Sequence, residues 1–237
     1  MGEEFCWEEL SPSLFICVSS AHKFGTDAFL LSDFAAPRRK DLCCDLGTGC
    51  GIIPLLWFRD DPPRLCYGAD IQKQAIEQLE QSIQKNGLKD RFIPLLTDLK
   101  ELSSLPCGPL DLVTCNPPYT QGQGGLTNRN SAKAIARHET TAGLADFVQC
   151  ASRLLKPKGS FFMVHRPSRL VDLCAAGRAF GLEPKELCFV SPKEGEIPNI
   201  MLVHMIKGGG PELRLLRPLY IYDEAGNYTE ELRACYR

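Results

Sequence analysis

From residue 41 onward, short apolar runs alternate with longer stretches in which apolar residues recur every three or four positions. The apolar runs predict strands at about 42–46, 65–70, 91–96, 110–115, 159–165, 185–191 and 200–206. The stretches between them predict helices at about 50–60, 73–86, 141–156 and 167–180. This alternation is typical of βαβ units. We therefore predict an α/β, Rossmann-like fold with a mostly parallel seven-stranded sheet and helices on both faces.

The length of 237 residues fits one large α/β domain. We expect residues 1–237 to form a single domain with an N-terminal extension of about 1–40 and a C-terminal tail of about 208–237. The tail is expected to hold a strand, a turn and a short helix that begins at Thr229. Residues 120–140 are glycine-rich and polar and show no period, which predicts a long functional loop.

The formal net charge is −2, so bulk electrostatics would not draw the chain to nucleic acid or to an anionic membrane. A polyanionic partner would need a local basic patch. The candidates for such a patch are Arg38, Arg39, Lys40, Lys133, Arg137, Arg166 and Arg169. For the cluster at 38–40, a solvated turn is the favoured interpretation.

No stretch approaches the roughly 18 apolar residues that a membrane span needs, so no membrane partner is expected. The acidic start, Met1-Gly2-Glu3-Glu4, stands where a secretory signal would be basic, and we expect a cytoplasmic protein. The 12 cysteines include no C-x-x-C pair, which predicts reduced thiols that act as small apolar side chains. No metal site is predicted.

A glycine-rich turn, Asp45-Leu46-Gly47-Thr48-Gly49-Cys50-Gly51, directly follows the first core strand. Its glycines permit a tight turn and a close approach of the backbone to a ligand. The dinucleotide fingerprint G-x-G-x-x-G/A is not met, because its last position is Ile52. An anionic Asp45 would repel a pyrophosphate but suits an ammonium group. The turn therefore favours S-adenosylmethionine over NAD, although a purely structural turn is the alternative.

Acidic residues follow the next two predicted strands. Asp70 ends Tyr67-Gly68-Ala69-Asp70, where a carboxylate can accept hydrogen bonds from a ribose diol. Asp98 follows the third strand, where it could accept from an adenine amino group, with the Leu99 backbone against the ring. Both support an adenosine-containing cofactor, and an ordinary loop or helix-capping role is the alternative for each.

The most specific motif is Asn116-Pro117-Pro118-Tyr119, at the end of the apolar strand Asp111–Cys115. Two prolines lock their φ angles, so the Asn116 side chain and the Pro117 carbonyl can form a rigid pair of acceptors. An exocyclic amino group offers two N–H donors for such a pair. Tyr119 can stack on the flat face of a base or an amide. The motif predicts methylation of a planar NH₂ group.

Together these motifs resemble the class I S-adenosylmethionine-dependent methyltransferases that act on amino groups. Within that class the chain, over about residues 10–237, resembles the bacterial tRNA(Val) adenine-N6 methyltransferase family. The features that carry this closer resemblance are Lys23–Leu31, Arg137-His138-Glu139, Pro218–Tyr222 and Tyr228–Leu232. It implies a transferase that methylates adenine N6 beside the anticodon of a tRNA, with neither a metal nor a covalent enzyme intermediate.

The resemblance also implies site residues. Cofactor binding falls to Asp45, Gly47, Gly49, Gly51, Asp70, Ile71, Asp98, Leu99 and Thr26. Asn116, Pro117 and Tyr119 are the implied catalytic residues, and Pro118, Arg137 and His138 would contact the substrate. A packed or RNA-contacting His138 is favoured over a general base, because the amine need not lose its proton before attack. Arg137 could meet a phosphate or form a surface ion pair.

Two rival functions compete with tRNA methylation. Protein glutamine-N5 methyltransferases acting on release factors use the same four-residue motif, since a side-chain amide also offers an NH₂. Those enzymes carry a separate helical domain before the core, whereas about 40 residues precede the first core strand here. A non-catalytic RNA-binding module is disfavoured by the intact glycine turn and the intact N-P-P-Y motif.

Overall fold

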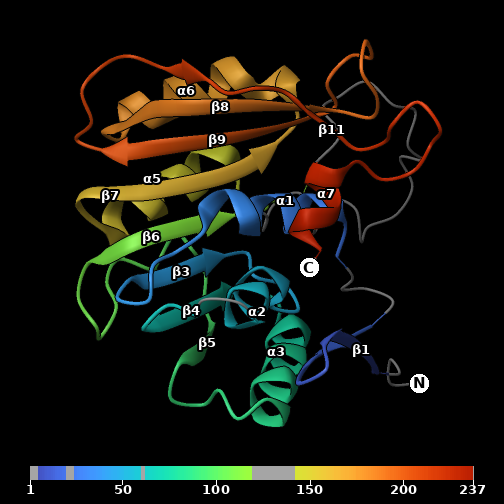
Figure 1. Cartoon of the computed structure of the whole chain (residues 1–237). Helices are drawn as coiled ribbons and strands as arrows, with labels where there is room; N and C mark the ends of the chain where they lie inside the picture. Colours follow the sequence, from blue (N-terminus) through green and yellow to red (C-terminus); the bar gives the residue numbers. More distant parts are fainter. Residues whose placement is uncertain (1–4, 20–23, 60–61, 119–141, 237) are drawn as a thin grey trace, which may run out of the picture.

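The computed structural model describes residues 5–19, 24–59, 62–118 and 142–236, which form a nine-stranded sheet, a separate two-stranded hairpin and flanking helices (Figure 1). The sheet order is β10-β8-β9-β7-β6-β3-β4-β5, and β11 also pairs with β8. The strands are β3 (Leu42–Leu46), β4 (Leu65–Asp70), β5 (Phe92–Leu96), β6 (Leu110–Cys115), β7 (Leu155–His165), β8 (Leu182–Ser191), β9 (Ile200–Lys207), β10 (Arg214–Leu215) and β11 (Leu219–Tyr220). The seven longer strands are those that the sequence predicts. Only β9 runs antiparallel to its neighbours β7 and β8.

Most predicted strand boundaries are confirmed, and β7 differs most. It begins at Leu155 rather than at residue 159, because Leu155 already pairs with Leu110 of β6. The chain bends inside this pairing: the register shifts between Leu110 and Leu112, and Lys158 has a φ of 64°. The apolar run from residue 159 marks the regular part of the strand.

Helices cover both faces of the sheet, as predicted (Figure 1). One face carries α1 (Thr26–Ala35), α2 (Ile52–Arg59), α3 (Lys73–Lys85) and α7 (Glu230–Cys235). The other carries α5 (Leu144–Leu154) and α6 (Leu170–Ala179), and the 3-10 turn η1 (Pro167–Arg169) directly precedes α6. Thr229 caps α7 by accepting the N–H of Leu232, so the predicted tail helix is confirmed. None of the described helices is long and apolar enough to cross a membrane.

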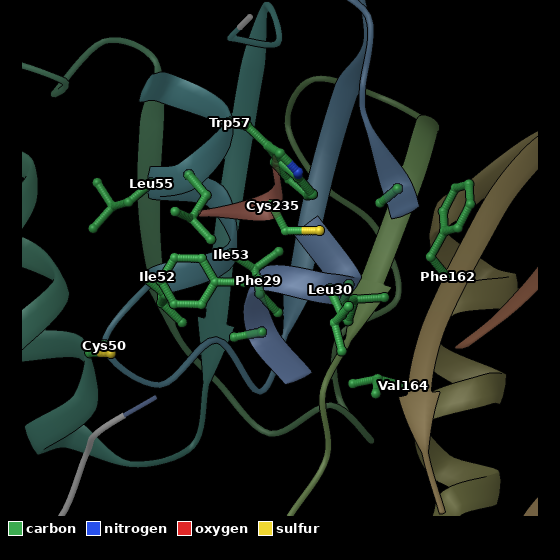
Figure 2. Close-up of a cluster of buried hydrophobic side chains, with 14 of the residues drawn as sticks. Phe29, Leu30, Cys50, Ile52, Ile53, Leu55, Trp57, Phe162, Val164 and Cys235 are labelled. Carbon is green, nitrogen blue, oxygen red and sulfur yellow. The ribbon is translucent and has the colours of Figure 1, made fainter. Parts of the chain in front are cut away.

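The prediction of a plain N-terminal extension missed α1. This helix is apolar around most of its circumference, with Ala28, Phe29, Leu30 and Leu31 all buried, so no 3.6-residue period stands out. Figure 2 shows α1 side chains in a cluster that also draws on α2, β7 and Cys235 of α7. The extension and the tail therefore contribute to the core.

The extension also contains the hairpin of β1 (Cys6–Ser11) and β2 (Leu14–Val18). Three polar residues spaced by four hydrogen-bond β2: Gln78 and Ser82 of α3, and Asn86, which directly follows the helix. Asn86 accepts the N–H of Phe15 (2.9 Å) and donates to its carbonyl (2.6 Å). Ser82 accepts the N–H of Cys17 (2.9 Å), and Gln78 donates to the Cys17 carbonyl (3.3 Å). Residues four apart lie on one face of a helix, and residues two apart lie on one side of a strand. The same side of β2 therefore meets these side chains in turn, and their hydrogen bonds hold the hairpin against α3.

Asn86→Ala is expected to lower the free energy of unfolding by about 2 kcal/mol, because the Phe15 N–H and carbonyl lose their partners. Urea denaturation of the whole chain measures this change. The matched control is Gln81→Ala, an exposed position on the same helix, which should stay within about 0.5 kcal/mol of wild type. Equal stability of the two variants would contradict this account of the hairpin.

The strand order places a switch point between β3 and β6. After β3 the chain adds β4 and β5 on one side, and it then returns to place β6 on the other side of β3. In open α/β sheets, ligands bind outside the carboxyl ends of the strands at such a point. The predicted glycine turn and N-P-P motif follow β3 and β6, so both lie there.

Candidate active site

The glycine turn after β3 has a backbone that only glycine adopts readily. Gly47, Gly49 and Gly51 have φ values of 70°, 55° and 85°. A Cβ on Gly51 would lie 2.5 Å from Leu79, so this glycine permits close packing of the turn on α3. A Cβ on Gly49 would meet no heavy atom within 4 Å, so the turn borders open space there. The turn is therefore tight, as the sequence predicts, and its binding of a ligand stays a prediction.

Asp45 lies at the end of β3 and is buried, with 1% of its surface exposed. The Thr114 hydroxyl on β6 donates to its Oδ1 at 2.7 Å. Its Oδ2 and the Thr48 hydroxyl are buried without a hydrogen-bond partner among the described residues. Burial raises the pKa of Asp45 to about 7, against the opposing effects of the Thr114 hydrogen bond and of the neighbouring Thr48 hydroxyl, which lower it. An unsatisfied buried carboxylate oxygen fits a cationic ligand group beside the glycine turn.

Asp70 is the last residue of β4, and its side chain hydrogen-bonds the backbone of the glycine turn. Its Oδ2 accepts the N–H of Gly49 and its Oδ1 the N–H of Gln72, each at 2.9 Å. A carboxylate has about four acceptor sites, so both oxygens retain capacity for a ribose diol. Ile71 follows with 51% of its surface exposed, which leaves its side chain accessible to a ligand.

The remaining predicted cofactor residues lie near the ends of other elements. Asp98 follows β5, where its Oδ1 accepts the N–H of Lys100 at 2.8 Å and shapes the turn. Leu99 is buried in the core cluster on the α5 and α6 face, so its side chain packs in the protein interior. Thr26 begins α1, and its hydroxyl accepts a hydrogen bond from Tyr236 at 3.1 Å.

The N-P-P corner after β6 lies next to the glycine turn. Asp45 pairs with Thr114, and Leu46 with Cys115, in the parallel ladder of β3 and β6. Gly47 and Asn116 are the next residues after the two strands, so both motifs leave the sheet from neighbouring strands, side by side. Asn116 is half-buried, Pro117 is buried and Pro118 is exposed. Pro117 therefore packs in the protein interior, whereas Pro118 is accessible from solvent.

Tyr119, Arg137 and His138 lie outside the described residues, so their predicted roles remain predictions. The basic residues that the sequence suggests for one RNA-binding patch lie at two opposite edges of the sheet. Arg38, Arg39 and Lys40 precede β3 at the amino edge of the sheet, whereas Arg166 and Arg169 follow β7 at the carboxyl edge. Lys133 also lies outside the described residues.

All 12 cysteines are in the described part of the chain as free thiols, and most are buried, as expected for small apolar side chains. Burial raises the pKa of Cys44, Cys66 and Cys115 well above the ordinary value, which keeps these thiols protonated. Within the described ranges, no group of three or more His, Cys, Asp or Glu side chains could hold a metal ion.

The sequence prediction missed Thr114 and Thr48, the two hydroxyls that surround Asp45. Thr114 is fully buried within the apolar run Leu112–Cys115 of β6, directly opposite Asp45 in the register of the two strands. A polar residue in the middle of Leu112-Val113-Thr114-Cys115 was the available signal, because buried hydroxyls need a partner.

Comparisons with known proteins agree with this geometry. The family model described as methyltransferase small domain matches residues 18–170. A tRNA1(Val) (adenine(37)-N6)-methyltransferase of Porphyromonas gingivalis (strain ATCC BAA-308 / W83) is 31% identical over 189 residues, covering 77% of this chain and 73% of that protein. The enzyme of the same name from Tolumonas auensis is 29% identical over 184 residues, 77% and 76% of the two chains.

Solved structures share the fold. A predicted O-methyltransferase from Agrobacterium tumefaciens superposes with a TM-score of 0.69 at 21% identity, covering 89% of this chain and 95% of that one. M. jannaschii TYW2 in complex with AdoMet gives a TM-score of 0.58 at 14% identity, with 87% and 86% coverage. The family match spans more than half of the sequence, and the chain therefore belongs to the methyltransferase small domain family.

Proposed function

We propose that this protein transfers a methyl group from S-adenosylmethionine to the exocyclic N6 amino group of an adenine in tRNA. The specific target that we propose is adenine 37 of tRNA1(Val), which the names of its curated relatives state for those enzymes. One observation carries the proposal: the N-P-P corner and the glycine turn leave adjacent, register-paired strands. An amino group held at the corner therefore lies beside a ligand held by the turn.

The residues of the glycine turn fit the cofactor. The unpartnered Asp45 Oδ2 suits its ammonium group, the open side of Gly49 leaves room for its amino-acid end, and Asp70 retains acceptors for the ribose. When bound, the cofactor supplies an electrophilic methyl group on a sulfonium. We assign no metal to the reaction.

The corner holds and orients the target amine. The Asn116 side-chain oxygen and the Pro117 carbonyl accept its two N–H groups, which favours a pyramidal nitrogen whose lone pair points away from them. The amine is a weak nucleophile because its lone pair is delocalised into the ring, so fixed approach geometry is the main contribution of the protein. We propose that Tyr119 stacks on the target ring and that Pro118, Arg137 and His138 contact the RNA.

Cofactor affinity is expected to depend on pH through Asp45. Its pKa of about 7 in the unliganded protein means that the carboxyl is protonated below this pH. The cofactor ammonium favours the ionised form, so binding below about pH 7 releases a proton. The dissociation constant should rise by about tenfold per pH unit as the pH falls from 7 to 5, where the ammonium stays charged. Calorimetry in buffers of different ionisation enthalpy measures the proton released.

The function is tested by incubating the protein and radiolabelled S-adenosylmethionine with tRNA1(Val) transcript or with release factor. Digestion of the RNA and nucleoside analysis should place the label on N6-methyladenosine. A transcript with guanine at position 37 should remain unlabelled. Label on a glutamine of the release factor, with none on the RNA, would overturn the assignment to tRNA.

We also propose that the chain forms one methyltransferase domain and acts in the cytoplasm. The first part is supported by the shared core, in which side chains of β2, α1 and α7 join those of the central strands. The second is supported by the tRNA substrate.

A further inference from the structure

The tip of β7 lies beside the N-P-P corner. β7 pairs in parallel with β6, and Cys115 is opposite Met163. Asn116 follows Cys115 on one strand, and Val164 and His165 follow Met163 on the other. Arg166 and Arg169 come soon after His165, so both arise at the carboxyl edge next to the corner.

Local hydrogen bonds fix the chain at this tip. The N–H of Arg166 donates to His165 Nδ1 at 2.8 Å, and the N–H of Arg169 donates to the Arg166 carbonyl at 3.0 Å. Pro167 begins the 3-10 turn and restricts its φ angle. The two arginines therefore start from an ordered turn, not from a long loop.

Two arginines and one carboxylate, Arg166, Arg169 and Asp172, give the tip one excess positive charge. Burial lowers the pKa of His165, and the charges of Arg169 and Arg166 lower it further, so this histidine is neutral at pH 7. Arg166 is exposed, and the Arg169 side chain is 40% exposed. Asp172 pairs with Arg169: its Oδ2 lies 2.7 Å from Arg169 Nε, and its side chain is 61% exposed. An exposed pair of this kind is weak and can exchange for a phosphate.

We propose that Arg166 and Arg169 bind backbone phosphates of the RNA next to the nucleotide held at the N-P-P corner. This inference rests on the proposed function, because it concerns how the same site takes its RNA. A chain with a net charge of −2 needs a local patch to hold a polyanion. Guanidinium groups match phosphate in geometry, and phosphate contacts set the register of the nucleic acid, while the corner selects the base.

Arg166→Gln and Arg169→Gln test the proposal in equilibrium binding of tRNA1(Val) transcript over a range of salt concentrations. Removing one arginine–phosphate interaction should reduce the slope of log affinity against log salt by about 0.7 to 0.9. Affinity at low salt should fall several-fold. Cofactor affinity should not change, because neither arginine lies at the glycine turn.

The matched control is Arg178→Gln. It removes the same charge from the opposite end of α6, where Arg178 pairs with Glu183, and it should keep the wild-type slope. Arg169→Lys keeps the charge and should also keep the slope. Unchanged thermal unfolding shows that each variant is folded.

Wild-type slopes in both glutamine variants would overturn the phosphate site, even if the wild-type protein methylates tRNA. A slope change of equal size in Arg178→Gln would overturn it too, because the effect would then be one of bulk charge. Failure of the proposed function is a separate result, in which the wild-type protein places no label on tRNA.

Discussion

Asp45→Asn is expected to weaken S-adenosylmethionine binding by about 100-fold at pH 8, equivalent to about 3 kcal/mol. The variant keeps the size and one acceptor of the side chain but loses the charge that faces the ammonium. Cofactor binding to the variant should release no proton, unlike binding to the wild type. Calorimetric titration at pH 6 and pH 8 measures both effects.

The same substitution should leave the unliganded protein at least as stable as wild type at pH 8. The ionised carboxylate is buried with an unpartnered oxygen, which is costly. Because its folded pKa is raised, the native state binds more protons than the unfolded state between pH 3.8 and about 7. The contribution of Asp45 to the free energy of unfolding of the wild type therefore increases as the pH falls through that window. The free energy of unfolding of the variant should not show this increase.

The control for Asp45→Asn is Asp90→Asn, an exposed carboxylate before β5, which should change neither property. Loss of stability together with unchanged cofactor affinity in Asp45→Asn would contradict the role assigned to this residue. Asp45 would then be a structural partner of Thr114 only.

Asn116→Ala is expected to lower kcat by about 1000-fold, by analogy with the removal of one preorganised polar group from an active site. Cofactor affinity should stay near wild type, because Asn116 lies on the β6 side of the switch point and the glycine turn on the β3 side. Single-turnover methyl transfer and cofactor titration separate the two quantities.

Asn116→Asp is the informative companion variant. It retains a side-chain oxygen that accepts an N–H, so it should keep much more activity than the alanine variant. If both variants kept full turnover, the corner would have no part in catalysis. If both lost cofactor binding, Asn116 would belong to the cofactor site instead.

The central strands and the two motifs could be predicted from the sequence because each signal is local. Short apolar runs of the length of a strand indicate β3, β4 and β6. The glycines of the turn adopt φ values that few other residues adopt. The adjacency of the glycine turn and Asn116 depends on the strand order, which the structure supplies and no local signal contains. The Leu46–Cys115 register then places them side by side.

The hairpin and α1 could not be predicted by the same means. α1 is buried on nearly all sides, so its sequence lacks an amphipathic period. β2 is tied to α3 by side chains that are distant in the sequence, such as Ser82, which lies 65 positions from Cys17. Likewise, the buried pairing of Thr114 with Asp45 depends on two strands that are separated by 69 positions. Long-range contacts of this kind leave no local pattern.

The claim that the Asn116 side chain holds the N6 amino group is tested most directly by a double-mutant cycle. Wild type and Asn116→Ala are each bound to tRNA1(Val) carrying adenine or purine at the target position, since purine lacks only the amino group. We expect purine to weaken binding to wild type but hardly to the variant, with a coupling of about 1 kcal/mol. Equal losses for both proteins would show that Asn116 does not contact the amine.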